Sequence, residues 1–339
     1  MKDWSFSINW RLIFSVIMWY TLNCVYVVQQ KAFLNILPVH VTFSGFLMIL
    51  GSILSLLIWA VGWRDLPRFK GAKRALKIFF PLAMCHLLVN YGAVISMGIG
   101  AVSFTQVIKA GEPVFTATLS ILVLREFLNV YAYLSLIPIV VGISLASVKE
   151  LDFNIWAFLF AMLSNLGSSS RAILAKITMK NKDEIGENLT AANIYMILTL
   201  ISGTLSVPLV LCIEAYKWKP LWVEHTANLT TWQKCHLLLR AFISAVSYYS
   251  YNDFAFYCLG QINQVGHSVA NTLKRVFVIV VSIIIFSNPV TPLGYVGMVM
   301  AVLGALSYSL SNQGFFNRKQ KEAAEVRGLE IATQQSQLL

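Results

Sequence analysis

The sequence predicts an all-α membrane protein in which ten transmembrane helices form an inverted five-plus-five repeat. Three observations lead to this fold class: the composition, ten apolar runs of spanning length, and a similarity between two segments in the two halves of the chain. Hydrophobic residues make up 57% of the 339 residues and charged residues only 12%, about half the charged share that is usual in soluble domains. Most of the chain is therefore expected to lie in a lipid bilayer.

The ten apolar runs are each long enough to cross the hydrocarbon core, which takes about 20 helical residues. In chain order they cover residues 11–30, 41–62, 77–99, 101–124, 130–148, 154–178, 191–214, 236–258, 264–287 and 291–312. Gly98 and Gly100 separate the third run from the fourth, which are otherwise nearly continuous. The connection 215–235 contains three tryptophans, which is typical of an amphipathic segment at the membrane surface.

The two halves of the chain resemble each other. "NVYAYLSLIPIVVGISLAS" (129–147) and "TPLGYVGMVMAVLGALSYS" (291–309) both have an early tyrosine, an apolar middle, and a glycine five residues before the final serine. The helix before each segment carries a lysine in apolar surroundings. These features predict two five-helix repeats, 11–148 and 154–312, with the lysines at the repeat interface. A short N-terminal segment (1–10) and a C-terminal tail (313–339) flank them.

The net charge of +11, from 26 basic and 15 acidic residues, is distributed as in a membrane protein. Ten spans put both termini on one side, and that side holds sixteen lysines and arginines, among them the cluster in 64–77, against six on the other. Positive charges concentrate on the cytosolic side of membrane proteins. Both termini are therefore expected in the cytosol, and the positive charge does not indicate binding to nucleic acid.

Four cations and one acid fall within or near the ends of apolar helices: Lys109, Arg171, Lys274, Arg275 and Glu112. A cation at the centre of a membrane helix costs about 2.5–3.5 kcal/mol and usually faces a partner or an aqueous cavity. Snorkelling to a helix end is an alternative for the two arginines, but Lys109 has long apolar segments on both sides. Glu112 is close enough in sequence to pair with Lys109. The excess of positive charge predicts a cavity that receives an anion.

The residues around these cations fit a phosphate site. Pro113 cannot donate a hydrogen bond and its ring disfavours the carbonyl of Lys109, so the helix is expected to bend at this lysine. Lys274 and Arg275 project about 100° apart on a helix and can close on one ligand from two directions. Lysine supplies a compact charge, and arginine supplies a planar fork that fits phosphate oxygens.

Four segments carry a resemblance to a known family: "AVSFTQVIKAGEPVFTATLS", "LIPIVVGISLAS", "AMLSNLGSSSRAILAKITMK" and "VGHSVANTLKRVFVIVVSIIIFSNPVTPLG". They are similar to the plastidic phosphate translocators, the triose-phosphate and phosphoenolpyruvate carriers of the drug/metabolite transporter superfamily. This resemblance implies ten helices in an inverted repeat and an antiport of inorganic phosphate against phosphorylated metabolites of three, five or six carbons, with no cofactor.

The resemblance also implies roles for individual residues. Lys109, Lys274 and Arg275 would hold the phosphate. Tyr251, within "SYYSYNDFAF", and Arg171 match family positions that meet the organic part of the substrate. Asn90 falls where triose-phosphate carriers have histidine and phosphoenolpyruvate carriers have asparagine.

The subtype within the family stays open. Asn90 and the serines 168–170 favour phosphoenolpyruvate or a broad pocket for three-carbon compounds, including triose phosphate and 3-phosphoglycerate. "KAGEP" is instead similar to the hexose-phosphate branch. A nucleotide-sugar transporter shares the fold, but it needs a pocket for a base, and the Lys–Arg pair fits a terminal phosphate better.

Other classes of protein fit the sequence less well. A membrane enzyme needs a nucleophile with a base or a metal cluster, but the five histidines are scattered with no acid or cysteine at ligand spacing. The five cysteines likewise show no metal or disulfide spacing, so no metal site is expected. A seven-helix receptor does not fit ten spans and an internal repeat.

The resemblance implies a plastid membrane. No cleavable signal or transit peptide is recognisable before the first apolar run. Either such a leader has been removed or the protein needs none. In the second case the outer membrane of an apicoplast or another complex plastid fits best.

Overall fold

The computed structural model describes residues 10–125, 127–148, 153–180, 185–261, 264–287 and 290–311. The expected C-terminal tail and all of the N-terminal segment except Trp10 lie outside these residues. The helices are α1 (Trp10–Leu34), α2 (His40–Ala60), α3 (Ala72–Ile99), α4 (Val102–Lys109), α5 (Glu112–Leu119), the π-helix η1 (Ser120–Leu124), α6 (Val130–Val148), α7 (Ile155–Lys180), α9 (Ala191–Ile213), the 3-10 helix η2 (Ala215–Lys217), α10 (Trp218–Thr226), α11 (Thr231–Gln261) and α12 (Gln264–Phe286). A last helix covers Pro292–Ser311.

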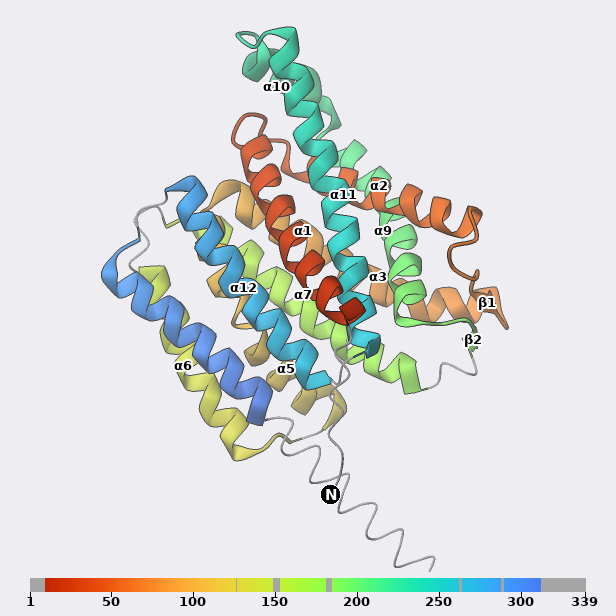
Figure 1. The fold of residues 1–339 in the computed structure, drawn as a ribbon, viewed down its shortest axis with the longest axis vertical. Coiled ribbons are helices and arrows are strands. Elements are labelled where there is room, and N and C mark those ends of the chain that lie inside the picture. Colours follow the sequence, from red (N-terminus) through yellow and green to blue (C-terminus); the bar gives the residue numbers. More distant parts are fainter. Residues whose placement is uncertain are drawn as a thin grey trace, which may run out of the picture.

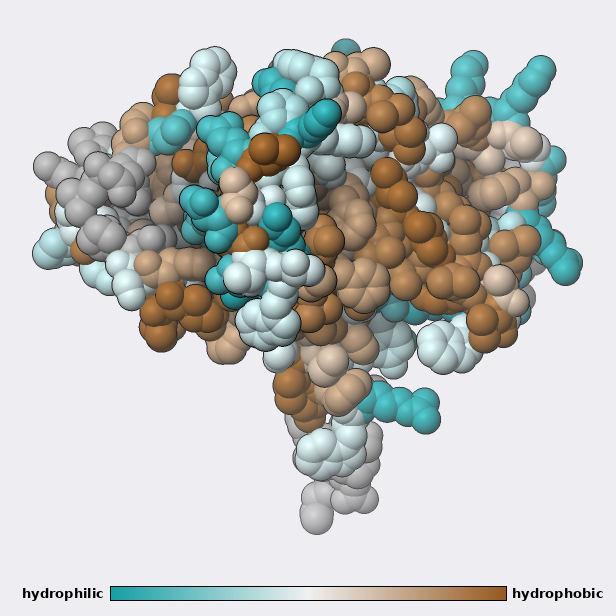
Figure 2. All heavy atoms as spheres, turned by 90° about the horizontal axis from the view of Figure 1, so that it is seen from above, coloured by the Kyte–Doolittle hydropathy of each residue, from teal (hydrophilic) through white to brown (hydrophobic). Residues whose placement is uncertain are grey.

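Seven helices of the described residues are long and apolar enough to cross a membrane: α1, α2, α3, α6, α9, α12 and the last helix. The prediction of a helical membrane protein is thereby confirmed. α7 and α11 are longer than a span requires, with 26 and 31 residues, but polar runs interrupt them at 164–171 and 247–253. Large hydrophobic side chains remain exposed on several helices and cover a wide area in Figure 2, as expected of a surface that contacts lipid.

The helices pack in a few extensive pairs. α1 lies along α11, α3 along α7, and α2 along α9, and α1 and α11 run side by side through the middle of Figure 1. One apolar core forms where α1, α2, α3 and α11 meet. A second forms between α4, α5, α6, α12 and the last helix. Among the described residues, the strands are only β1 (Arg68–Phe69) and β2 (Gly186–Glu187), which pair antiparallel.

Two charged side chains form hydrogen bonds with backbone groups at the ends of other helices. Lys31, in the last turn of α1, donates to the carbonyls of Gly98 (3.0 Å) and Gly100 (2.8 Å) at the end of α3. Val39 precedes α2 without a capping side chain, and the Glu214 carboxylate accepts from the Thr42 amide at 2.5 Å instead. Helix ends have unpaired backbone groups that need such partners in a membrane protein.

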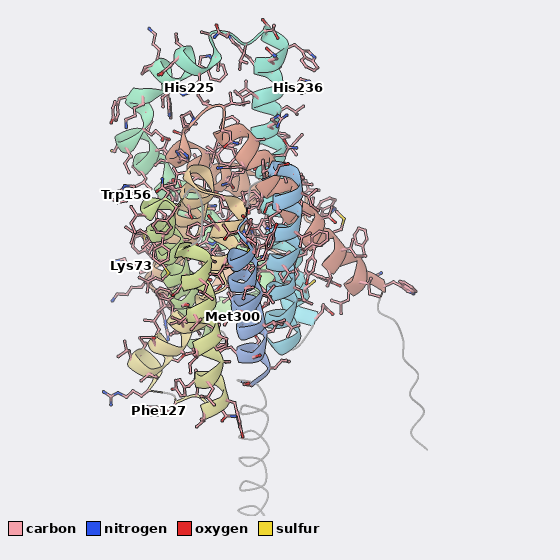
Figure 3. All side chains as sticks on the ribbon, turned by 90° about the vertical axis from the view of Figure 1, so that its left-hand side faces the viewer. Lys73, Phe127, Trp156, His225, His236 and Met300 are labelled. Carbon is pink, nitrogen blue, oxygen red and sulfur yellow. The ribbon has the colours of Figure 1, made fainter. Side chains whose placement is uncertain are left out.

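The connection before α11 lies at one end of the molecule. Figure 3 shows His225 of α10 and His236 of α11 at one end, and Phe127, between η1 and α6, near the other. In Figure 1, α10 and the start of α11 project beyond the other helices. The predicted connection 215–235 is therefore largely helical and lies at one end of the bundle, where Leu221, Trp222 and Leu229 pack against the first apolar core.

Candidate substrate site

The fourth apolar run is broken at the lysine. α4 ends at Lys109, α5 begins at Glu112, and only Ala110 and Gly111 connect them. Pro113 is the second residue of α5, where its missing N–H removes no helical hydrogen bond. The bend that the sequence predicts at Lys109 is thus confirmed, and it is a complete interruption of the helix rather than a kink.

Two side chains from other helices donate hydrogen bonds to the carbonyls at the break. Asn165 Nδ2, on α7, donates to the carbonyl of Ile108 at 2.7 Å. Arg275 Nη1, on α12, donates to the carbonyl of Lys109. A helix can be interrupted at membrane depth only where other groups satisfy its backbone. Asn165 and Arg275 supply two such groups from the second half of the chain.

Glu112 is the acid of this site. Its carboxylate forms an ion pair with Arg275 and accepts a hydrogen bond from Ser168 Oγ. As the first residue of α5 it also lies where the helix dipole favours a negative charge. The pairing with Lys109 that the sequence spacing allows is not found. Lys109 Nζ donates instead to Ser164 Oγ on α7, at 2.6 Å.

Lys274 lies between aromatic rings. Its Nζ is 5.6 Å from the ring centroid of Trp19, on α1, and 5.5 Å from that of Tyr251, on α11. Tyr251 also packs against the rings of Tyr26 and Tyr248, with centroid distances of 5.6 Å to each. Aromatic faces attract a cation, but Lys274 has no acidic partner among the residues that the structure describes.

Arg171, on α7, contacts α3 one helical turn before Asn90. Arg171 Nη1 lies 2.7 Å from Nδ1 of His86, which is one helical turn before Asn90 on α3. Asn90 is 2% exposed, and its amide lies beside the hydroxyl of Tyr248. Neither polar atom of this amide makes a hydrogen bond of normal geometry within the described part of the chain. Such a buried, unsatisfied amide needs an explanation.

The six residues that the sequence singles out thus belong to one region. The charges of Arg171, Arg275 and Glu112 act on both Lys109 and Lys274. Of the two acids Glu112 and Asp253, only Glu112 is available to the four cations. Asp253 instead forms a bidentate ion pair with Arg64 (2.6 and 2.7 Å). That hydrogen-bonded pairing raises the pKa of Arg64, which lies in the loop after α2. The region therefore carries a net positive charge in the described structure.

Two residues of the site, Ser164 and His86, are not singled out by the sequence analysis. Ser164, which contacts Lys109, shares a helical face with Ser168 and Arg171 at i, i+4 and i+7. His86 has the same i, i+4 relation to Asn90 on α3. This spacing of polar residues along otherwise apolar helices is the signal that could have found them.

An apolar cavity of about 380 Å³ lies next to the charged region, between α5, α6 and α7. Its wall includes Gly111, Phe115, Ile143 and Met162, and it contains none of the six predicted site residues. No group of His, Cys, Asp and Glu in the described residues could hold a metal ion. The excess of cations in the neighbouring charged region favours an anion.

Comparison with known proteins gives a family that covers most of the chain. The family model described as the Triose-phosphate Transporter family matches residues 10–309. The phosphoenolpyruvate/phosphate translocator 1 of Oryza sativa subsp. japonica is 36% identical over 86% of this chain and 69% of its own length. A triose phosphate/phosphate translocator of Brassica oleracea var. botrytis is 36% identical (86% and 70%), and the glucose-6-phosphate/phosphate translocator 1 of Arabidopsis thaliana is 35% identical (86% and 72%). All three are named as chloroplastic.

Solved structures also share the fold. One crystal structure superposes with a TM-score of 0.50 at 11% sequence identity, and the match covers 90% of this chain and 96% of the other.

Proposed function

The chain belongs to the triose-phosphate transporter family, and on this premise we propose that it exchanges inorganic phosphate for phosphorylated three-carbon compounds. The exchange takes place across a plastid membrane by alternating access. Triose phosphate, 3-phosphoglycerate and phosphoenolpyruvate are the substrates of this proposal, and the membrane enzyme and receptor alternatives are set aside. Relatives named for phosphoenolpyruvate, triose phosphate, glucose 6-phosphate and xylulose 5-phosphate all have similar identities, between 32% and 37%, so identity alone does not rank the substrates.

The observation that carries the proposal is the charge balance of the site. Lys109, Arg171, Lys274 and Arg275 interact electrostatically and share Glu112 as their acid within the described residues. A cluster of four cations with one acid, placed among spanning helices, is costly unless an anion joins it. A phosphate dianion would cancel much of this excess.

Each predicted residue takes a role in this proposal. Lys109, Lys274 and Arg275 hold the phosphate group. Arg275 uses two of its five N–H groups for Glu112 and the Lys109 carbonyl, so donors remain for a ligand. Arg171, Asn90 and Tyr251 meet the organic part. Ser164, which contacts Lys109, and Arg171 are seven residues apart, or about 10 Å along the α7 axis, which suits a small phosphorylated compound.

Obligatory exchange follows from the same charges. When the site is empty, closing it removes water from the cations, and their repulsion grows as the local dielectric constant falls. A bound phosphate group offsets that repulsion. Only the loaded carrier therefore passes readily through the closed state.

We also propose that the spans form the inverted five-plus-five repeat, with the broken α4–α5–η1 segment as the fourth of ten and both termini in the cytosol. The packing supports this arrangement. If each helix of the first half corresponds to the helix five positions later, the pair of α1 with α11 corresponds to the pair of α7 with α3. These are the two most extensive helix pairs. The broken helix packs against α12, where Lys274 and Arg275 lie.

Uptake of labelled phosphate into liposomes that hold the purified protein and internal phosphate tests the function. Dihydroxyacetone phosphate, phosphoenolpyruvate, glucose 6-phosphate and UDP-glucose serve as external competitors. The proposal predicts uptake that the two three-carbon compounds block. Block by glucose 6-phosphate alone would identify a hexose-phosphate carrier. Absence of phosphate uptake, with transport of UDP-glucose, would support a nucleotide-sugar carrier instead.

A further inference from the structure

We propose that His86 is a positioning residue, which aims the guanidinium of Arg171 at a carboxylate on the organic end of the substrate. This inference rests on the proposed function, because it concerns how the same site ranks its substrates. It goes beyond that function by giving a role to a residue that the phosphate cluster does not use. The contact between Arg171 Nη1 and His86 Nδ1, at 2.7 Å, is its starting point.

The chemistry of the contact fixes the state of the imidazole. A guanidinium has donors only, so Nδ1 of His86 must accept the hydrogen bond. His86 is then neutral, with its proton on Nε2, because a protonated ring would set two donors and two positive charges against each other. Nε2 is buried and makes no hydrogen bond with the residues that the structure describes. His86 therefore has one polar contact in the described structure, and that contact is with Arg171.

The imidazole is held in place by packing. His86 is 1% exposed. Tyr195, on α9, meets its ring edge to face, with a centroid distance of 5.9 Å and an interplanar angle of 87°. The Tyr195 ring is in turn stacked on Phe256 at 5.0 Å. A ring confined in this way offers its acceptor in one direction, so it orients the arginine that bonds to it.

The backbones of α3 and α7 approach closely in the turns next to this contact. A Cβ on Gly92 would lie 2.7 Å from the carbonyl oxygen of Phe160, and a Cβ on Gly167 would lie 3.1 Å from the carbonyl oxygen of Cys85. The first distance is shorter than a Cβ contact allows, and the second would require a shift of the neighbouring backbone. The two helices therefore form a rigid frame that keeps His86 opposite Arg171.

Arg171 keeps most of its donors for a ligand. One Nη1 proton goes to His86, and no carboxylate of the described residues pairs with the guanidinium. The remaining N–H groups can bind a carboxylate in the bidentate way that arginine favours. One helical turn after His86, Asn90 offers a buried amide that lies beside the Tyr248 hydroxyl and makes no hydrogen bond of normal geometry in the described residues. This surrounding suits a substrate with a carboxylate at the end opposite the phosphate better than one with a neutral carbonyl or hydroxyl.

Competition assays with substituted proteins test the inference. In each variant, the inhibition constants of phosphoenolpyruvate and dihydroxyacetone phosphate against labelled phosphate exchange are measured, and their ratio is compared with that of the unsubstituted protein. His86→Leu removes the acceptor and puts an apolar side chain of similar size in its place. It should shift the ratio against phosphoenolpyruvate by about tenfold, as expected for a hydrogen bond to a charged group. His86→Asn places an amide oxygen near the Nδ1 position and should restore most of the preference.

The controls separate this role from a structural one. His236→Leu makes the same change at an exposed position of α11 and should leave the ratio unchanged. If His86→Leu does not yield folded protein, His86→Gln replaces it, because its longer side chain moves the amide oxygen away from the Nδ1 position. Equal ratios in the Asn variant, the Leu or Gln variant and the unsubstituted protein would overturn the inference while leaving phosphate exchange established. Absence of phosphate exchange in the unsubstituted protein would overturn both.

Discussion

Arg275 donates one hydrogen bond to the main-chain carbonyl of Lys109 and another to the carboxylate of Glu112. One side chain of α12 thus holds both ends of the break in the α4–α5 segment. The same guanidinium is proposed to bind phosphate. Arg275 therefore connects the shape of the broken helix to the occupancy of the site, and Glu112 competes with the ligand for it.

Glu112→Gln is expected to raise phosphate affinity and to destabilise the protein when phosphate is absent. The amide keeps the volume of the side chain but removes the charge that offsets the cations. The unoccupied protein should then lose thermal stability, and phosphate should restore more of it than in the unsubstituted protein, since a ligand stabilises according to its affinity. Thermal unfolding across a phosphate titration measures both effects. An affinity that is unchanged or lower would contradict the competition between Glu112 and the ligand.

Lys274→Ala should weaken phosphate binding and loosen the coupling of exchange. The variant loses a charged donor, which corresponds to about a tenfold or larger fall in affinity, and the empty site closes with less repulsion. Some uptake into vesicles without internal phosphate is therefore expected. Lys219→Ala, at an exposed position of α10, is the matched control. Tight coupling together with unchanged affinity in the Lys274 variant would exclude the proposed role.

Gly92→Ala should destabilise the frame between α3 and α7. Its Cβ would lie 2.7 Å from the Phe160 carbonyl oxygen and 2.9 Å from the Ser164 amide nitrogen, both backbone atoms that cannot move aside alone. Overpacking of this kind costs about 1–3 kcal/mol. Gly71→Ala is the comparison, because its nearest neighbour is 3.9 Å away. Melting temperatures in detergent should fall for Gly92→Ala only, and equal values would show that the helices are not held this closely.

Asp253→Asn should remove the ion pair that attaches the loop after α2 to α11 and should lower the stability of the protein. The bidentate pair with Arg64 is partly buried, with side chains 27% and 22% exposed. Its strength should lie between that of surface and buried pairs, or about 1–2 kcal/mol. A double-mutant cycle with Arg64→Gln measures the coupling from melting temperatures. Additive effects of the two substitutions would mean that the pair contributes no net stability.

The sequence predicts the helices well because apolar runs in a membrane have few alternatives to a helix. The expected fifth span, 130–148, has the observed bounds of α6. Other ends differ because distant residues determine them. α1 continues four residues past its expected end at residue 30, to Leu34, and its last turn includes Lys31, which bonds to two carbonyls at the end of α3.

The site is predictable in its charges but less so in its contacts. Pro113 lies four residues after Lys109, so local stereochemistry predicts the break. The partners of that break, Asn165 and Arg275, are 57 and 166 residues from the carbonyls they bind. The contact of His86 with Arg171 likewise spans 85 residues. Only the packing of the helices determines such pairs.

The excess positive charge of the site is proposed to make phosphate exchange obligatory. The most direct test compares labelled phosphate uptake into liposomes loaded with phosphate and into liposomes without it, with the same purified protein in both. Rapid uptake into loaded vesicles and almost none into empty ones are expected. Equal initial rates in the two preparations would contradict this proposal, because the unloaded carrier would then cross the closed state as readily as the loaded one.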